Sequence, residues 1–444
     1  MPTPASTSIT GATAAEIADS VRALIDRGEL TPGDALPPVR SLAEQLGVNR
    51  NTAVAAYRRL ARSGAVVAQG RAGTRVAGSS AVPQEGYADA GALRDLGTGN
   101  PAPELIPELV PALQAAGGRP VLYGEPVIDP ELESWARRWM APDVPSEGGD
   151  FRLTLTSGAV DAVERLLAQA LMRDDAVALE DPCFLASIHT VRVNGYRAVP
   201  VPVDAEGMTA DGLRAALEQG VRAVVCTPRA QNPTGASLSE TRARQLREVL
   251  ADHPYVLVIE DDYYSMLSRS PFRSIIGPEH RRWALVRSVS KFVGPDMCLA
   301  LTATDPQTAE RLAMRLSPGT TWVSHLLQRI THAVLRDDGS RALIERAGQH
   351  YAERNADFRA RLKGHGLSVE PGDGISLWVP VGAPARAVAE RLMRRGWLVR
   401  TGDEFRLGQA AAPSRHLRVT VHELEEQEAD SLAADIAAAV RETG

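Results

Sequence analysis

Lysine occurs at only two positions in this chain of 444 residues, Lys291 and Lys363, although Lys and Arg together number 49. Lys291 ends the run Ser288-Val289-Ser290-Lys291 behind a short apolar stretch, whereas Lys363 lies in an ordinary polar segment. A lysine amine can lose its proton near neutral pH and attack an aldehyde to form a Schiff base, which an arginine cannot do. The one lysine kept in this run therefore indicates a need for an amine.

Two carboxylates, Asp261 and Asp262, directly follow the apolar run Val256–Ile259. A carboxylate at the end of a buried strand is costly unless it has a cationic partner, and a protonated pyridine nitrogen would be one. The next residues, Tyr263 and Tyr264, offer a phenol to a neighbouring oxygen.

Three further segments carry groups suited to a flat, phosphorylated ligand. Ser157-Gly158-Ala159 closes an expected strand and opens a helix, whose free backbone N–H groups suit a phosphate. The turn Gln231–Gly235 places the amide of Asn232 rigidly at a strand end. Phe184 follows another strand, where its ring could stack on a heterocycle or simply belong to the core.

Short apolar runs alternate with helical patterns through the middle of the chain, which predicts a mostly parallel sheet flanked by helices, an α/β body. Ligands bind at the carboxyl ends of strands in such sheets, so these segments are expected to meet in one crevice. The apolar runs are Leu153–Thr156, Ala176–Leu179, Ala198–Val203, Ala223–Thr227, Val256–Ile259, Ala284–Val286 and Leu299–Thr302. Apolar alternation near residues 375–379 and 417–421 indicates a second, smaller α+β subdomain.

The N-terminal region has the pattern of a helix-turn-helix followed by a hairpin. A capping box at Thr13–Glu16 opens a first helix that ends near Gly28, and a short second helix follows Pro38. Asn49 is suited to cap a third helix that runs to Gly64. Val66–Val76 then reads as a hairpin with a glycine-containing tip, which would be the wing.

The distribution of charge along the chain also distinguishes this N-terminal region from the rest. Between Arg40 and Val76 the chain has seven arginines against the single acid Glu44, while the whole chain is formally −6. A basic module on an acidic body indicates an anionic partner for the module alone. Side chains at the start of a recognition helix reach base edges in the major groove, and this predicts DNA contacts from Arg50, Asn51 and Thr52. Other arginines suit phosphates or the minor groove: Arg58, Arg59, Arg62, Arg71 and Arg75. A merely solvated arginine-rich surface is the alternative.

Other classes of protein fit poorly. No apolar stretch is long enough for a membrane span, and the N-terminus lacks the basic and apolar regions of a secretory signal, so we expect a cytoplasmic protein. The widely spaced Cys183, Cys226 and Cys298 predict neither disulfides nor a metal site. The expected domains are 1–78 (winged helix-turn-helix), 79–95 (linker), 96–334 (large α/β domain) and 335–444 (small subdomain).

The run LPPVRSLAEQLGVNRNTAVAAYRRLARSGAV, followed by GRAGTRV, resembles the winged-helix domain of the GntR family of bacterial regulators over most of residues 11–77. On that family's pattern, Arg40, Arg50, Thr52 and Gly73 match positions that contact DNA.

From about residue 96 to 440 the motifs, in their order and spacing, resemble fold-type I pyridoxal-phosphate enzymes of the aminotransferase superfamily. The resemblance implies that pyridoxal phosphate forms a Schiff base with Lys291 and that Asp261 pairs with its pyridine nitrogen. It also assigns Arg418 to a substrate or effector carboxylate, a bidentate task. The remaining implied cofactor contacts are Asn232 and Tyr263 at the ring hydroxyl, Phe184 stacked on the ring, Ser157, Gly158, Ala159 and Ser288 at the phosphate, and Tyr123 at the phosphate of a partner subunit. A DxxY alignment would select Tyr264 in place of Tyr263.

The two domains together are similar to the MocR subfamily of GntR regulators, and TPRAQNPTG and RSVSK are most similar to its PtsJ-type members, which are linked to vitamin B6 homeostasis. The resemblance implies a homodimer that binds a double-stranded operator and couples capture of the cofactor or an amine effector to operator binding, with little or no turnover. An aminotransferase carrying a DNA-binding appendage is the alternative.

One position departs from the family pattern. Members usually carry an arginine seven residues after the Schiff-base lysine, in contact with the cofactor phosphate, and this chain has Cys298 there. The loss predicts weaker phosphate binding, and suggests a site that releases the cofactor readily or accepts unphosphorylated pyridoxal. Arg229, close to the Asn232 turn, could compensate.

Overall fold

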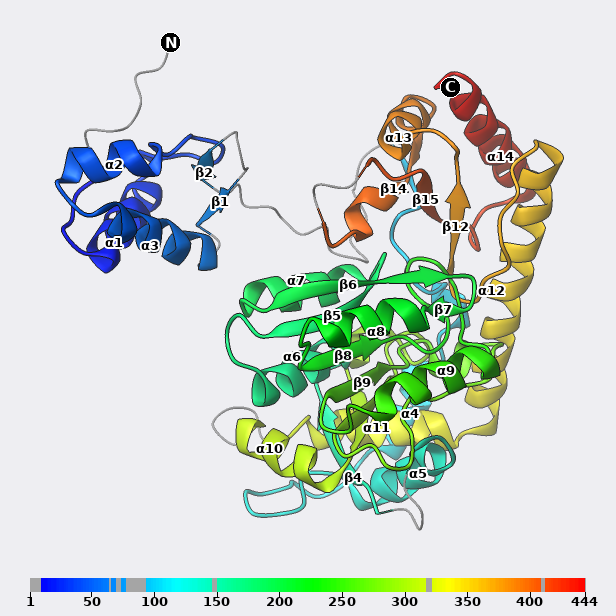
Figure 1. Cartoon of the computed structure of the whole chain (residues 1–444). Coiled ribbons are helices and arrows are strands. Elements are labelled where there is room, and N and C mark those ends of the chain that lie inside the picture. Colours follow the sequence, from blue (N-terminus) through cyan, green and yellow to red (C-terminus); the bar gives the residue numbers. More distant parts are fainter. Residues whose placement is uncertain are drawn as a thin grey trace. The chain divides into compact units, whose positions relative to one another are not determined.

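The computed structural model describes residues 9–63, 65–68, 73–76, 93–145, 150–316, 322–408 and 412–443. The chain divides into two compact units, residues 1–82 and 83–444 (Figure 1).

The first unit is a winged helix-turn-helix. Three helices precede an antiparallel hairpin in which Val66 pairs with Val76. Ile17, Leu42 and Leu60, one from each helix, are fully buried in a common core. The elements are α1 (Ala14–Asp26), α2 (Val39–Leu46), α3 (Arg50–Arg62), β1 (Val66–Ala68) and β2 (Thr74–Val76).

Both expected helix caps of this unit form. The Thr13 side chain accepts the N–H of Glu16 at 3.2 Å, while Glu16 reaches back to the backbone of Thr13, and this completes the capping box. The Asn49 side chain accepts the N–H of Asn51 at 2.8 Å. A cap satisfies backbone N–H groups that have no partner inside the helix, so these two side chains set where α1 and α3 begin.

The second unit is built on a sheet that has eight strands among the described residues, in the order β4-β11-β10-β9-β8-β5-β6-β7. The neighbours from β10 to β6 are parallel, whereas β11 runs antiparallel to both β10 and β4. The strands are β4 (Arg152–Thr156), β5 (Ala176–Asp181), β6 (Arg197–Asp204), β7 (Gly207–Met208), β8 (Ala223–Cys226), β9 (Leu257–Asp261), β10 (Trp283–Ser288) and β11 (Ala300–Thr304).

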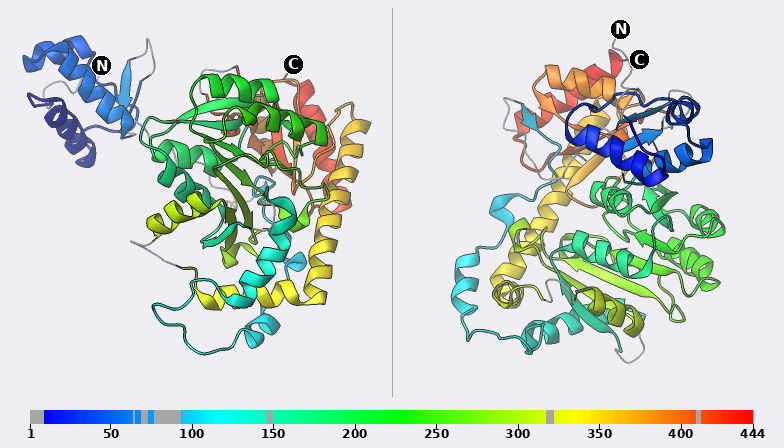
Figure 2. Two further views of the ribbon diagram at one scale, coloured as in Figure 1. Left: turned by 60° about the horizontal axis from the view of Figure 1, so that its bottom comes forward. Right: turned by 90° about the vertical axis from the view of Figure 1, so that its left-hand side faces the viewer.

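Helices cover both faces of this sheet (Figure 2). Residues of one strand alternate between two cores: Val177 and Leu179 pack on one side, and Ala176 and Ala178 on the other. Burial on both faces explains why the strands read as continuous apolar runs. The first core takes α6 (Ala159–Ala170), α7 (Leu185–Val193) and α10 (Pro306–Leu316). The second takes α5 (Pro130–Met140), α8 (Ala210–Glu218), α9 (Glu240–Ala251) and α11 (His325–Arg336), beside α4 (Leu109–Ala115).

A long helix, α12 (Asp338–Gly364), joins the large subdomain to the small one. Its Ala347 packs into the second core of the large sheet, and its Phe358 and Leu362 pack into the small subdomain. The small subdomain has a sheet in the order β12-β15-β14, covered by two helices. Its elements are β12 (Ser376–Pro380), β14 (Arg400–Thr401), β15 (His416–Thr420), α13 (Ala385–Arg394) and α14 (Glu426–Arg441).

The segment expected to end the linker takes part in the small subdomain. Arg94 and Asp95 form β3, which pairs in parallel with β13 (Trp397–Leu398). Most of the linker, residues 77–92, lies outside the described residues. The fold class expected from the sequence is confirmed, and the sheet is mixed, with antiparallel pairs at one end (β4-β11-β10) and at the other (β6-β7).

Candidate functional site

The carboxyl ends of the parallel strands bring the chemistry-bearing residues to one edge of the sheet. Ser157 follows β4, Phe184 follows β5, and Asn232 lies in the turn after β8. Asp261 ends β9, and Lys291 comes three residues after the end of β10. Strand order thus gathers residues that are more than 130 positions apart in the sequence.

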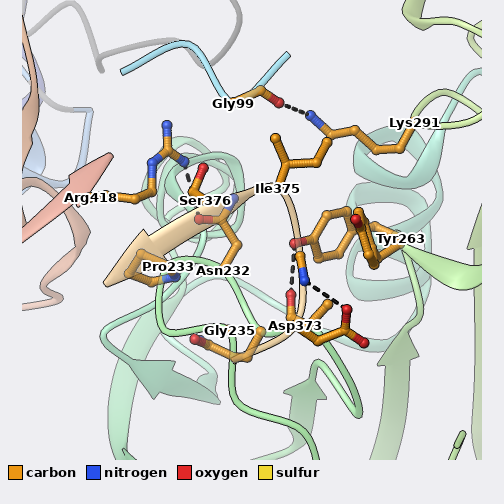
Figure 3. Close-up of a pocket in the computed structure, with 14 residues that line it drawn as sticks. Gly99, Asn232, Pro233, Gly235, Tyr263, Lys291, Asp373, Ile375, Ser376 and Arg418 are labelled. Atoms are coloured by element: carbon orange, nitrogen blue, oxygen red, sulfur yellow. Dashed lines mark hydrogen bonds between the residues drawn. The ribbon is translucent and has the colours of Figure 1, made fainter. Parts of the chain in front are cut away.

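A small pocket at this edge is lined by five of the expected residues, Asn232, Tyr263, Tyr264, Lys291 and Arg418 (Figure 3). Its cavity measures about 20 Å³. The other expected cofactor contacts, Asp261, Phe184, Ser288 and the Ser157–Ala159 segment, follow the same strand ends but do not line this cavity.

The two cations of the pocket are held by backbone carbonyls. Lys291 donates from Nζ to the carbonyl oxygen of Gly99 at 2.7 Å. Arg418, which is 1% exposed, donates to the carbonyl of Gly97 at 2.6 Å and to Oδ1 of Asn232 at 3.2 Å. Its guanidinium also lies 5.0 Å from the ring centre of Phe405. A carboxylate could take the place of the Gly97 carbonyl on this guanidinium.

Asp261 has the buried carboxylate that the sequence predicted. It is 5% exposed, and its Oδ1 has no hydrogen-bond partner among the described residues. Burial, together with the neighbouring charge of Asp262, raises the pKa of Asp261 to about 7. A protonated ring nitrogen would supply the missing donor and the missing positive charge, so this carboxylate fits pyridoxal phosphate.

Asp262, by contrast, is fully paired. It accepts two hydrogen bonds from Arg229, at 2.8 and 2.9 Å, and one from Arg287 at 2.8 Å. Burial would raise the pKa of Asp262, but the hydrogen bond from Arg229 and the charges of both arginines hold it below its ordinary value. Arg229 donates to Asp262 and to the carbonyl of Ser270 in this structure, and its compensation at the phosphate stays a prediction.

The aromatic residues line up as two parallel rings. Phe184 and Tyr263 have ring centres 6.4 Å apart with planes 5° from parallel, near the far end of the usual range of about 4.5–7 Å for aromatic pairs. The hydroxyl of Tyr263 donates to the carbonyl of Ala230 at 2.7 Å. Tyr264 is 1% exposed, and burial raises its pKa well above the ordinary value. Both tyrosines line the pocket, so the choice between them for a ring hydroxyl stays a prediction.

The expected phosphate cradle lies at the start of α6. Gly158 has φ +90°, a backbone conformation that is strained for any residue with a side chain. A Cβ at this position would lie 3.6 Å from Sγ of Cys298. The Cys298 thiol donates to the carbonyl of Ser157 at 3.4 Å, and the Ser157 N–H donates to Asp161 at 3.0 Å. Cys298 therefore does sit beside the cradle, and Asp161, which also accepts from Arg165 at 2.6 Å, lies there as well.

Two features of the site were missed from the sequence. The carbonyls of Gly97 and Gly99 bind the pocket cations, and a Gly-Thr-Gly run is only a weak signal for this. The buried Glu180 accepts hydrogen bonds from the Thr227 N–H and from Gln231, whose side chain in turn binds Thr234. Burial raises the pKa of Glu180 to about 7. This network supports the turn that carries Asn232.

The proposed DNA contacts lie on the first unit. Arg50 and Asn51 are exposed at the start of α3, and Thr52 is half-buried. Arg40 on α2 is exposed and pairs with Glu44 at 3.1 Å. Gly73, with φ +87°, precedes β2, while Arg71 lies outside the described residues. Arg75 is less available than expected, because its guanidinium donates to the carbonyl of Gly33 at 2.8 Å.

Comparisons with known proteins agree with both units. Residues 13–76 match the model of the gntR family of bacterial regulatory proteins, and residues 93–436 match that of class I and II aminotransferases. The chain belongs to the MocR-type regulators, which join these two domains. It is 45% identical over 429 residues to the vitamin B6 salvage pathway transcriptional repressor PtsJ of Salmonella typhimurium, covering 96% of this chain and 98% of the relative.

More distant relatives and solved structures match parts of the chain. The pyridoxine biosynthesis transcriptional regulator PdxR of Corynebacterium glutamicum is 26% identical over 325 residues, 68% of each chain. The kynurenine aminotransferase of Pyrococcus horikoshii superposes with a TM-score of 0.70 at 20% identity, covering 80% of this chain and 92% of that one. LysN of Thermus thermophilus gives 0.68 at 21% identity, with 79% and 93% coverage. These structures support the fold. No helix among the described residues is long and apolar enough to cross a membrane.

Cys298→Arg should strengthen binding of pyridoxal phosphate about tenfold to a hundredfold, because a charge-assisted hydrogen bond contributes about 1.5–3 kcal/mol. Pyridoxal, which has no phosphate, should bind the variant as it binds the wild type. Titrations followed by visible absorption measure both, with Cys298→Ser as the uncharged control. Equal phosphate affinity in the arginine variant and the wild type would sink the idea.

Arg50→Ala should weaken binding to a duplex selected from a random pool by roughly 5- to 150-fold, since a base-edge contact contributes about 1–3 kcal/mol. Arg58→Ala should weaken binding to all DNA sequences alike. It should also reduce the slope of log affinity against log salt concentration by about one, because one phosphate contact is lost. Arg27→Ala, which removes an exposed arginine that follows α1 and pairs with Glu29, is the matched control. The assignment of α3 as the recognition helix fails if Arg50→Ala and Arg27→Ala bind alike in fluorescence anisotropy.

Proposed function

We propose that this chain is a cytoplasmic transcription regulator that binds pyridoxal phosphate covalently at Lys291 and couples that capture to operator binding. The observation that carries the proposal is that one edge of the sheet holds both a pocket amine, Lys291, and a buried carboxylate, Asp261, whose Oδ1 finds no partner among the described residues. The same polypeptide carries a basic helix-turn-helix, which transamination does not need.

The chain's own residues divide the work of holding the cofactor. Asp261 would hold a protonated ring nitrogen, and Asn232 and a pocket tyrosine would orient the ring hydroxyl. Ser157, Gly158 and Ser288 would hold the phosphate. When bound, pyridoxal phosphate supplies an aldehyde for an amine and a pyridinium ring that withdraws electrons. Lys291 would supply the amine for this aldehyde, and its Nζ now donates to the Gly99 carbonyl.

The names of the relatives support a role in vitamin B6 metabolism. PtsJ is a repressor of the vitamin B6 salvage pathway, and PdxR regulates pyridoxine biosynthesis. A regulator that binds an end product of the pathway can adjust the expression of the pathway genes to the amount of that product. Coupling between two sites of this kind is typically about 1–3 kcal/mol, or roughly 5- to 150-fold in affinity.

A second copy of the chain is the proposed partner of an exposed apolar face. Tyr123 is 93% exposed and touches the ring of Trp322 edge-on, at 5.5 Å between centres. Other exposed apolar side chains of the same stretch and of α11 are Val110, Leu113, Leu122, Val127 and Leu326. A dimer would bury this face and could bring Tyr123 to the other subunit's phosphate cradle.

Light scattering should give twice the chain mass, and a monomer at micromolar concentration would contradict the dimer.

An aminotransferase with a DNA-binding appendage is the second candidate. Arg418 and Lys291 line one pocket, as substrate clamp and nucleophile would have to. Multiple-turnover formation of a keto acid from an amino acid would favour this function. A single round, with no further product, favours the regulator.

Lys291→Ala should abolish the visible absorption that appears when wild-type protein binds pyridoxal phosphate, because alanine offers no amine. Lys363→Ala, which removes the other lysine of the chain, is the matched control and should behave as wild type. If Lys363→Ala loses the absorption and Lys291→Ala keeps it, the assignment of the amine is wrong.

A further inference from the structure

A segment of the chain crosses the pocket, and its backbone carbonyls accept hydrogen bonds from both cations of the pocket, Lys291 and Arg418. This segment, Leu96–Ala102, is called the strap. The carbonyl of Gly99 accepts from Lys291 at 2.7 Å, and the carbonyl of Gly97 accepts from Arg418 at 2.6 Å and from Arg400 at 2.9 Å. Figure 3 shows Lys291 pointing at Gly99 across the top of the pocket.

Hydrogen bonds fix the strap at both ends. At one end, the N–H of Leu96 donates to Leu398 at 2.8 Å, and the carbonyl of Leu96 accepts the N–H of Thr420 at 2.8 Å. At the other end, the N–H of Ala102 donates to the hydroxyl of Tyr351 at 3.0 Å. Between these ends the carbonyl of Asn100 contacts Nε2 of His422 at 2.9 Å. The strap is thus held in a single, closed position.

The closed strap leaves no room for a ligand at the two cations. The cavity of about 20 Å³ is enough for one water molecule. A ligand carboxylate would need the place of the Gly97 carbonyl on Arg418, and an aldehyde would need the amine that binds Gly99. Ligand and closed strap therefore compete for the same groups.

The strap is also continuous in sequence with the connection to the DNA-binding unit. The first unit ends after β2, and the second unit is described from residue 93 on, where Arg94 and Asp95 form β3 directly before the strap. Leu96 alone separates Gly97 from β3, so the ligand site and the connection are adjacent along the chain.

We propose that the strap is the element that couples the ligand site to the DNA-binding domain, and that its full displacement needs a ligand with a carboxylate. The inference rests on the proposed function, since capture at Lys291 is the first of its two steps. Pyridoxal phosphate releases Gly99, when the carbon–nitrogen bond to Lys291 forms with loss of one water. Gly97 is released only when a carboxylate, such as that of an amino acid, replaces its carbonyl on Arg418. The response of operator binding is therefore graded: small with the aldehyde alone and larger with an amino acid added.

Gly99→Ala tests the strap without altering a side chain that binds ligand. Gly99 has φ +63°, and an added Cβ would lie 3.4 Å from Nη2 of Arg418, so alanine strains the closed strap. Gly382 has φ +64° with open space around its Cβ position, and Gly382→Ala is the matched control. Alanine in the left-handed region should open the strap about fivefold to thirtyfold more often and raise ligand affinity by up to that factor. Gly382→Ala should leave ligand affinity unchanged.

Hydrogen exchange of the full chain gives the second readout. The amides of Leu96, Gly97 and Ala102 are hydrogen-bonded in the closed strap, to Leu398, Asp95 and Tyr351 respectively. They should exchange faster in wild-type protein given pyridoxal phosphate and an amino acid, and already faster in ligand-free Gly99→Ala.

The two hypotheses fail in different ways. If visible absorption shows that pyridoxal phosphate binds, while strap exchange stays unchanged and both glycine variants bind ligand alike, the strap inference is overturned and the proposed function stands. If wild-type protein binds no pyridoxal phosphate, both are overturned. If strap exchange rises but operator affinity does not change with the amino acid, the coupling role is overturned.

Discussion

A buried ion-pair network at the carboxyl edge of the large sheet is the constraint on which the site depends. Asp262, fully buried at the end of β9, binds Arg229 and the 1% exposed Arg287, which also binds Asp143 at 2.6 Å. Loss of one partner from such a pair typically costs about 3–5 kcal/mol. The network fixes the ends of β9 and β10, and so places Asp261 and the turn to Lys291. It neutralises one of two adjacent carboxylates and leaves the other for a ligand.

The same principle explains the state of the pocket. Two cations that line one pocket need partners, and the strap supplies them as carbonyl oxygens from Gly97 and Gly99. A neutral carbonyl is a weaker partner for a guanidinium than a carboxylate. A ligand with the right charge can therefore replace the strap, while water cannot. Recognition of the ligand and release of a chain segment become one event, as regulation requires.

Much of this could be predicted from the sequence because the signals are local. Thr13 and Asn49 mark the helix starts through their own side chains, and strand ends marked by Asp261, Asn232 and Lys291 meet wherever parallel strands lie side by side. The strap could not be predicted, since backbone carbonyls leave no side-chain pattern. Nor could the partner of Arg229, which depends on how distant strands are ordered. The end of the linker was misplaced because a two-residue strand such as β3 carries too short a pattern.

The central claim is that an aldehyde captured on Lys291 changes operator affinity. The most direct measurement treats full-length protein with pyridoxal phosphate and borohydride, locates the reduced adduct by peptide mass spectrometry, and then measures operator binding of the trapped protein. We predict the adduct on Lys291 and an operator affinity changed by about fivefold or more from that of untreated protein. An adduct on Lys291 with unchanged operator affinity, or an adduct on Lys363 alone, would contradict the account.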